Sequence, residues 1–532
     1  MTLVLGPLLR RVVDDRATIW LETSEPATVE VIAGSGGGAA RTFTAFGRHY
    51  ALVVVDGLSP GAVTPYRVML DGEQAWPPPD YPFPAPVIRT RRDGAPVRLV
   101  FGSCREASQY VTEGIPPDAL DAYATRLAAT GADWPDSVVL LGDQVYADVP
   151  SPVTRRWLGR RRRVRHPEAP VDQVADYTEY ARLYHESWTG PQIRWLLSTV
   201  PSVMIFDDHE VIDDWNTSDS WRADVVRQPW WSERITAGLA SYWVYQHLGN
   251  LHPDELGTDP VYPAVVSADD ATATLREFGA RADRERAGYR WSYLVDIGDT
   301  RLVVLDNRCG RQLEPGRRAM LPDEQWDWFA KAVRSGRYRH LAIGCSLPWL
   351  LPYGVHHLEA VTSGLAESRW RPVAAAAEWL RRAADLEHWP AFGASFQALA
   401  ALLSQLDPNL VSVSVLSGDV HHTYVATPEL DGPPVFQITC SPVHNRVPAL
   451  MRRVFQVAWG RRSAWVGRAL ARLSGVEPLR LRWTKLAGPY FGNVVGTLVH
   501  SGHSAYVSIE ATDPRADLVR VMHAELADPA VG

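Results

Sequence analysis

Side chains of metal-binding types follow five short apolar runs in this sequence. Grouped by run, they are Cys104; Asp143 and Tyr146; Asp207, Asp208 and His209; Asp306, Asn307 and Arg308; and Asp419, His421 and His422. Carboxylates, imidazoles, thiolates and phenolates are ligands of hard and intermediate metal ions. Buried carboxylates without partners are very costly, and a bound polycation is the simplest way to hold several of them together. The five groups therefore predict one shared metal site.

Each of these residues also has a structural interpretation when it is taken singly. Cys104 could be a small buried hydrophobe, Asp143 a turn former, and Asp208 the N-cap of a helix. Asp306 and Arg308 could form a plain ion pair. The repetition of the pattern at five run ends favours convergence on one site over five separate structural roles.

The runs that carry these residues are short and nearly continuous in apolar character, which is typical of strands buried on both faces. We expect such strands at 97–104, 136–144, 201–210, 300–308, 340–348 and 410–422. Helices are expected between several of them, for example at 118–130 and 322–336. This alternation predicts an α/β (α+β) core, in which ligands collect at the carboxyl ends of the strands.

Residues 1 to about 90 have a different pattern, in which apolar and polar residues alternate between Gly, Ser and Pro turns. That pattern predicts an all-β unit. Leu58-Ser59-Pro60 and Tyr66-Arg67-Val68 resemble the turn and the tyrosine strand of a fibronectin-type sandwich. The proline-rich segment 76–86 predicts a stiff, extended connection. We therefore expect a β-sandwich domain at 1–92 and a catalytic domain at 93–532.

The composition argues against several other classes of protein. Lys and Arg number 54 and Asp and Glu number 61, so the net charge is −7, whereas a general nucleic-acid binder is usually basic. No GxxxxGK[ST] and no GxSxG motif follows a strand. The four cysteines match no zinc ribbon or disulfide framework, which favours a reducing compartment. Because no secretory signal and no long apolar span is visible, we expect a cytoplasmic protein.

Two segments are rich in arginine, at 154–167 and 449–473. The second mixes arginine with large apolar residues at roughly helical spacing, and we place an insertion at about 449–485. A solvated insertion packed on the core by its apolar side is the favoured interpretation of both segments. Peripheral contact with a membrane surface is the alternative for the second.

Five short motifs resemble a known family in their order and spacing. They are GSC (102–104), GDQVYAD (142–148), DDHE (207–210), LDNR (305–308) and SGDVH (417–421). Together they resemble the motif set of the alkaline phosphatase D, or PhoD-like, family, which belongs to the calcineurin-like metallophosphoesterases. The resemblance implies a core of two mixed sheets flanked by helices, often preceded by a small β-sandwich.

The resemblance also implies a set of metal ligands. By position, Asp143 matches a carboxylate that bridges two metals, and Cys104, Tyr146 and His421 match ligands of an iron ion. Asp208 and Asp419 then fall on a second metal. Thiolate and phenolate suit Fe³⁺, and oxygen ligands suit a hard ion such as Ca²⁺. The expected cofactor is thus a binuclear or larger centre of Fe³⁺ with Ca²⁺.

The activity implied is hydrolysis of phosphomonoesters or phosphodiesters by a water molecule that two metals activate. His209 would stabilise the transition state or protonate the leaving oxygen. Arg105 is a candidate phosphate contact, with a structural ion pair as its alternative. A further set is expected to orient the ligands or to be structural: Asp148, Asp207, Glu210, Asp213, Asp214, Asp306 and Arg308.

A rival function is a non-catalytic module that binds phosphate or a membrane on a phosphatase-like core. Such a module would have lost ligand residues, and all six proposed ligands are of coordinating types here. An enzyme is therefore the favoured interpretation, with a phosphoester as substrate and no nucleic acid as a specific partner.

Overall fold

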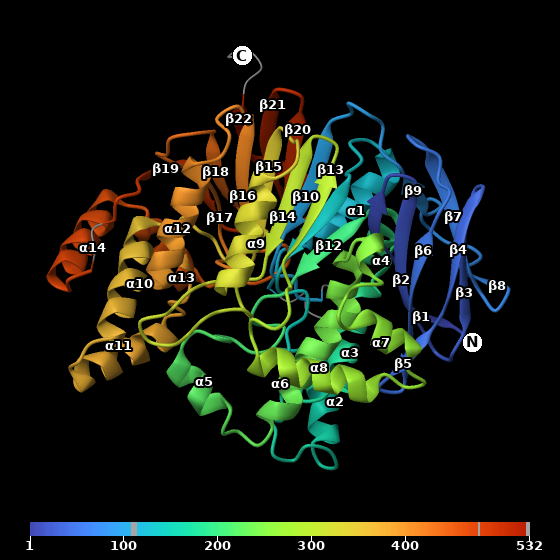
Figure 1. Ribbon diagram of the computed structural model, residues 1–532, viewed down its shortest axis with the longest axis horizontal. Coiled ribbons are helices and arrows are strands. Elements are labelled where there is room, and N and C mark those ends of the chain that lie inside the picture. The colour runs from blue at the N-terminus through green and yellow to red at the C-terminus, as the bar shows by residue number, and fades with distance from the viewer. Residues whose placement is uncertain (108–113, 477–478, 528–532) are drawn as a thin grey trace.

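The computed structural model describes residues 1–107, 114–476 and 479–527, so residues 477–478 of the expected insertion lie outside the described residues. Two large sheets lie face to face in the centre, and the N-terminal strands lie on one side (Figure 1). Helices α10 (Tyr353–Ala366), α11 (Arg371–Ala383) and α14 (Arg461–Leu473) lie on the other side (Figure 1). The expected α/β core with an all-β N-terminal part is confirmed.

The N-terminal part contains two small antiparallel sheets. The first has the order β1-β2-β6-β5, and the second has the order β4-β3-β7-β8, with β9 also paired to β7. The strands are β1 (Leu3–Val13), β2 (Arg16–Thr23), β3 (Thr28–Ala33), β4 (Gly36–Arg41), β5 (Phe43–Ala45), β6 (Arg48–Val55), β7 (Val63–Leu70), β8 (Glu73–Trp76) and β9 (Val87–Arg89). Side chains from both sheets, such as Ile19, Val31 and Val68, fill the space between them.

The six-stranded sheet of the core has the order β12-β11-β10-β20-β21-β22. Its strands are β10 (Val97–Gly102), β11 (Ser137–Leu141), β12 (Ser202–Ile205), β20 (Val494–Ser501), β21 (Ser504–Thr512) and β22 (Leu518–Ala527). β10, β11 and β12 are parallel, and the C-terminal strands complete the sheet in antiparallel fashion. The three parallel strands bring their carboxyl ends to one edge.

The seven-stranded sheet has the order β13-β14-β15-β16-β18-β17-β19. Its strands are β13 (Tyr293–Ile297), β14 (Thr300–Leu305), β15 (His340–Cys345), β16 (Ser412–Ser417), β17 (Thr423–Pro428), β18 (Val435–Thr439) and β19 (Trp483–Tyr490). β14, β15, β16 and β18 are parallel. Leu99, Val139 and Ile205 of the first sheet pack on Leu302, Val304 and Leu416 of the second, so both sheets share one apolar layer.

Helices cover the outer faces of both sheets. On the six-stranded sheet these are α1 (Ala119–Thr130), α3 (Tyr177–Trp188), α4 (Pro191–Thr199) and α6 (Trp231–Tyr242). On the seven-stranded sheet they are α9 (Asp323–Arg334) and α12 (Gly393–Ser404). The remaining helices are α2 (Pro152–Arg161), α5 (Asp219–Val225), α7 (Tyr262–Ser267), α8 (Thr272–Arg284), α10 (Tyr353–Ala366), α11 (Arg371–Ala383), α13 (Ala449–Ala458) and α14 (Arg461–Leu473).

The N-terminal strands pack tightly on the core. Trp20 and Tyr50 belong to the same buried cluster as residues of α3, α4 and α6. Arg10 is fully buried and donates hydrogen bonds to the carbonyl oxygens of Ser202, Tyr245 and Gln246. The sandwich therefore supports the strand β12 that leads into the DDHE motif. Among the described residues, no helix is long and apolar enough to cross a membrane.

Candidate metal centre

The predicted site residues lie in tight turns at the carboxyl ends of β10, β11, β12 and β16. Cys104, Asp143, Asp419 and His421 adopt left-handed backbone conformations, with φ of 57°, 52°, 63° and 47°. Such a conformation costs a non-glycine residue about 1–3 kcal/mol and concentrates at functional sites. The strained turns thus coincide with the positions of the predicted site residues at the strand ends.

Two glycines allow these turns to approach one another. A Cβ on Gly142 would lie 2.6 Å from Cβ of Asp207, and a Cβ on Gly418 would lie 1.9 Å from Oγ of Ser103. Because each glycine directly precedes a proposed ligand, Asp143 or Asp419, a larger residue would push that ligand away from the shared site.

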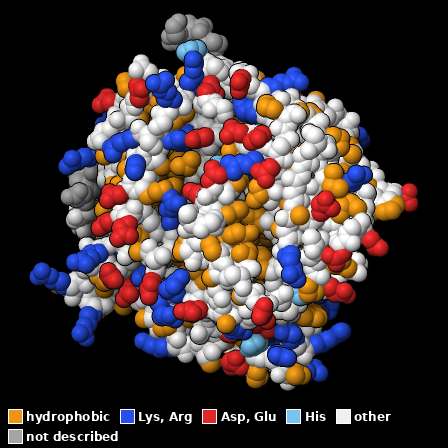
Figure 2. Space-filling view, turned by 45° about the vertical axis from the view of Figure 1, so that its right-hand side comes forward, with side chains coloured by type: hydrophobic (Ala, Val, Ile, Leu, Met, Phe, Trp, Pro, Cys, Tyr) orange, Lys and Arg blue, Asp and Glu red, His pale blue; other side chains and the backbone are white. Residues whose placement is uncertain are grey.

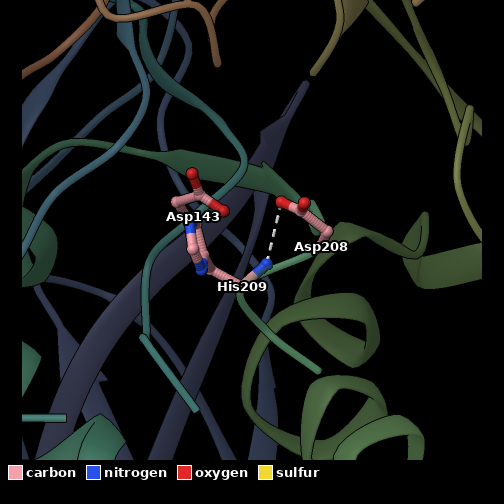
Figure 3. Close-up of side chains that lie close together, drawn as sticks. All are labelled: Asp143, Asp208 and His209. Carbon is pink, nitrogen blue, oxygen red and sulfur yellow. Dashed lines mark hydrogen bonds between the residues drawn. The ribbon is translucent and has the colours of Figure 1, made fainter. Parts of the chain in front are cut away.

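Four carboxylates meet at this edge of the sheets. Asp143, Asp207, Asp208 and Asp419 each offer one oxygen, and these oxygens all lie within 4.8 Å of one another. Asp143, Asp208 and His209 form an overlapping group, which Figure 3 shows with the side chains turned toward one another. The structure therefore brings together Asp143, Asp208 and Asp419, as the sequence predicts, and adds Asp207.

Two oxygens of this cluster lack partners. Oδ1 of Asp143 and Oδ2 of Asp207 are buried and accept no hydrogen bond within the described part of the chain. Burial raises the pKa of both Asp143 and Asp208 above the ordinary carboxyl value, and it raises that of Asp207 to about 6. Buried, unpartnered oxygens on crowded carboxylates fit a bound cation, which would supply the missing charge.

Cys104 and Tyr146 are buried near enough to Asp143 for its charge to act on both side chains. Cys104 is fully buried, and its Sγ lies 3.1 Å from Oγ of Ser103 and 3.2 Å from Oγ of Ser441. Burial raises the pKa of the thiol and of the Tyr146 phenol, and the charge of Asp143 raises both further. These groups would ionise only beside a strong cation such as a bound metal ion.

His421 lies close to Asp419 in the same turn. Burial lowers the pKa of His421 to about 4, so its imidazole is neutral and can serve as a ligand at neutral pH. Thiol, phenol and imidazole are donor types that suit iron, and carboxylates suit a hard ion. Within the described part of the chain, however, the groups whose ligand atoms lie within 4.8 Å of one another include neither Cys104 nor His421.

His209 stands at the rim of the cluster and is held by a carboxylate. Its Nδ1 lies 2.9 Å and 3.0 Å from the two carboxylate oxygens of Asp148, and Asp148 also accepts a hydrogen bond from the amide of Asp213. Burial alone would lower the pKa of His209, but the charges of Asp148 and Asp143 raise it well above its ordinary value. Asp148 thus fixes the orientation of the His209 ring, which lies beside Asp143.

Two residues expected to be supporting hold the loops in place. Glu210 accepts hydrogen bonds from the backbone amides of Asp143, Gln144 and Asp207 at 3.0, 2.8 and 2.8 Å. The fully buried Arg308 pairs with Asp207 and lies 3.4 Å from Oδ1 of Asp208. Both hold together the loops that carry Asp143, Asp207 and Asp208.

The structure does not bring Arg105 to the cluster. Its guanidinium pairs with Asp118 at 2.8 Å and Asp121 at 3.2 Å, and it donates to the carbonyl oxygen of Ser187 at 2.7 Å. Arg105 follows Cys104 directly, but the turn sends the two side chains in different directions. These contacts fit the ion-pair alternative for Arg105 better than contact with phosphate.

Sequence reasoning missed His388, which lies in the helical region between β15 and β16. Its Nε2 lies 2.9 Å from Oδ2 of Asp419, and its Nδ1 lies 2.8 Å from Oε1 of Glu359. Burial would raise the pKa of Asp419, but the hydrogen bond from His388 lowers it to about 2. No motif or apolar run precedes His388, so the sequence holds no signal for this contact.

Asn445 was also missed. Its Nδ2 donates to the Tyr146 hydroxyl at 2.8 Å and orients that phenol. Asn445 and the adjacent His444 lie in the loop after the end of β18. A histidine that follows a buried strand is the sequence signal that points to this loop.

Comparisons with known proteins agree with this geometry. One family model, described as PhoD-like phosphatase, matches residues 99–449, and a second, described as a domain of unknown function (DUF7800), matches residues 1–88. Comparison with curated protein sequences gives no match.

Two solved structures share the fold. A structure described as that of PhoD matches with a TM-score of 0.60 at 14% identity, covering 98% of this chain and 89% of that one. The purple acid phosphatase PPD1 from yellow lupin (Lupinus luteus) seeds matches with a TM-score of 0.50 at 11% identity, covering 98% and 74%. The family model spans more than half of the sequence, so the chain belongs to the PhoD-like phosphatase family and is a phosphoester hydrolase.

Proposed function

We propose that the chain hydrolyses phosphomonoesters or phosphodiesters at a centre of two or more metal ions. The observation that carries this proposal is the cluster of Asp143, Asp207, Asp208 and Asp419, with two buried oxygens that no other described group satisfies. Family membership supplies the reaction class, and the cluster supplies the place where cations would be held.

We propose Fe³⁺ and Ca²⁺ as the metals. Asp143 would bridge them, with Cys104, Tyr146 and His421 on the iron and Asp208 and Asp419 on the calcium. When bound, such a pair would activate a water molecule and neutralise the charge of the phosphate. The presence of thiol, phenol and imidazole groups as well as carboxylates around Asp143 supports this unequal pair.

The residues around the ions would have distinct tasks. His209, held by Asp148, would carry the proton that the leaving oxygen needs. Asp207 has one unpartnered oxygen and one paired with Arg308, so it would complete the second ion's surroundings or orient Asp208. Arg308 would hold Asp207 and Asp208 in place.

The alternative, a non-catalytic module that binds phosphate or a membrane, predicts a different result from an enzyme. A degenerate module would bind phosphate but release no product. The test is hydrolysis of an aryl phosphate and an aryl phosphodiester by the wild type and by Asp143→Asn. We expect metal-dependent turnover that the variant loses, with an exposed substitution such as Asp269→Asn as control. Equal turnover in Asp143→Asn and wild type would overturn the site assignment.

We also propose the division of the chain into a sandwich domain at 1–92 and a catalytic domain at 93–532, with an insertion at about 449–485. The match of separate family models to 1–88 and 99–449 supports it. We propose a cytoplasmic location, which the four free, buried cysteines support. Limited proteolysis and cell fractionation test these two points.

A further inference from the structure

Helices α13 and α14 expose large apolar side chains. Val457, Trp465 and Leu473 are 69%, 67% and 85% exposed, and Leu450, Val454, Val466 and Leu470 are also exposed. The buried residues on the inner faces of these helices are small: Ala458, Ala464, Gly467 and Ala471. This is the reverse of an ordinary surface helix, which buries its large apolar residues and exposes its polar ones.

Some of these exposed apolar side chains line a groove of about 480 Å³ between α10, α13 and α14. Its walls include Leu358 and Val361 of α10, Val454 and Val457 of α13, and Val466 and Leu470 of α14. An apolar groove of this kind on a protein surface marks a place where something apolar docks.

The same two helices are strongly basic. They carry six arginines and no acidic residue, although the whole chain has a net charge of −7. All six are exposed, and none forms an ion pair with another described residue. They are Arg452, Arg453, Arg461, Arg462, Arg468 and Arg472. By contrast, the face of the molecule in Figure 2 intersperses acidic and basic side chains.

We propose that α13 and α14 form a docking surface for anionic phospholipid bilayers. Exposed valine, leucine and tryptophan next to arginine is the composition of helices that lie in the membrane interface. The apolar side chains would enter the acyl boundary, the groove would accept acyl chains, and the arginines would contact lipid phosphates. The charge is what favours a bilayer over a protein partner, because one-sided positive charge matches a continuous anionic surface.

The docking surface adjoins the metal centre. The ring of Phe455 in α13 stacks on the ring of His422 with centroids 4.1 Å apart, and His422 follows the proposed ligand His421. The loop that leads from β18 into α13 contains Asn445, which donates a hydrogen bond to the Tyr146 hydroxyl. Docking would therefore hold a lipid surface next to the loops of the candidate metal centre. Binding to the membrane does not depend on the proposed phosphoesterase activity.

Vesicle binding by the full-length protein tests the proposal. The probes are phosphatidylcholine vesicles with about one third phosphatidylglycerol, against pure phosphatidylcholine vesicles, in a flotation assay. We expect binding to the anionic vesicles at least about tenfold tighter, and weaker as salt screens the arginines. Failure to bind anionic vesicles would overturn the proposal.

Two sets of exposed substitutions localise the surface. Val457→Ser with Trp465→Ser and Leu473→Ser should lower the partition coefficient at least about tenfold, whereas Val164→Ser with Val171→Ser, also exposed, should not. The triple substitution of Arg461→Gln, Arg462→Gln and Arg468→Gln should also lower the partition coefficient at least about tenfold. The matched control removes equal charge on and after α2: Arg160→Gln with Arg163→Gln and Arg165→Gln. Equal losses in test and control sets would refute the assignment.

Two further outcomes are distinguishable. Asp143→Asn should bind vesicles as the wild type does, so loss of activity and loss of docking are read separately. A different result would be a dimer in sedimentation that Trp465→Ser disrupts, together with no vesicle binding. In that case α13 and α14 form an interface between two copies of this chain, and the membrane proposal is wrong.

Discussion

His388 joins Asp419 to Glu359 through its two ring nitrogens, at 2.9 Å from Oδ2 of Asp419 and 2.8 Å from Oε1 of Glu359. Burial alone would lower the pKa of His388, but these two carboxylates raise it well above its ordinary value. Burial also raises the pKa of Glu359. His388 therefore links the buried Glu359 to one carboxylate of the cluster and holds Asp419 in a fixed orientation.

Replacement of His388 should weaken the second metal site. In His388→Ala, Asp419 loses its orienting donor, and we expect affinity for calcium to fall roughly 10–100-fold. Iron content should stay near that of the wild type, because Cys104 and Tyr146 are untouched. Calcium titration by calorimetry measures the effect, with His503→Ala on the surface as control. Unchanged calcium affinity would contradict the role of His388.

Replacement of His209 should affect turnover more than metal content. His209→Asn removes the proton carrier, and we expect kcat to fall roughly 10²–10⁴-fold with metal content retained. Asp148→Asn should have a smaller effect on kcat. Because Asp148 raises the pKa of His209, its loss should move the alkaline limb of the pH–rate profile to lower pH. An alkaline limb that stays in place would show that His209 is not the acid.

Replacement of Cys104 should remove iron from the protein but not the second metal. Cys104→Ala should lose iron and any thiolate-to-iron absorption in the visible range, and it should retain the second metal. The matched control is Cys309→Ala, since Cys309 is also buried and free but packs in the helical cluster. Equal iron in both variants would remove Cys104 from the ligand set.

Metal removal should make stability depend on pH in a defined direction. Burial raises the pKa of Asp207, Glu210 and Asp214 to about 6, 7 and 8. A carboxyl whose pKa is raised on folding lowers stability as pH rises from its unfolded value through its folded value. The chelated protein should therefore lose thermal stability between about pH 5 and pH 8.

The metal-loaded protein should show the opposite trend. Metal binding requires ionised ligands and so strengthens as pH rises, which should keep its melting temperature level or raise it across the same range. Thermal unfolding followed by circular dichroism, with and without chelator, measures both forms. Parallel pH dependence in the two forms would mean that no cation neutralises the cluster.

The strand ends could be predicted from the sequence because the apolar runs before Cys104, Asp143, Asp208 and Asp419 are short and sharply bounded. Strands buried on both faces leave that signature, and parallel strands bring their ends together. The residues that reach the site from elsewhere leave no such trace. His388 lies in a helical region whose position depends on packing over the seven-stranded sheet.

The direction of the Arg105 side chain could not be predicted from the sequence either. Adjacent residues in a tight turn point in different directions, and the left-handed conformation of Cys104 turns Arg105 toward Asp118. A residue beside a ligand in sequence need not lie beside it in space. The N-terminal strands give a third case, because their alternating pattern does not show that Arg10 would be buried against Gln246.

These predictions share one hypothesis: Asp143 and the donors around it would hold an unequal pair of metal ions. Elemental analysis of freshly purified protein tests it most directly, with Asp143→Asn measured alongside. We expect iron and calcium in a ratio of about one to one or one to two, and loss of both in the variant. Zinc alone in the wild type, or unchanged metal content in Asp143→Asn, would contradict it.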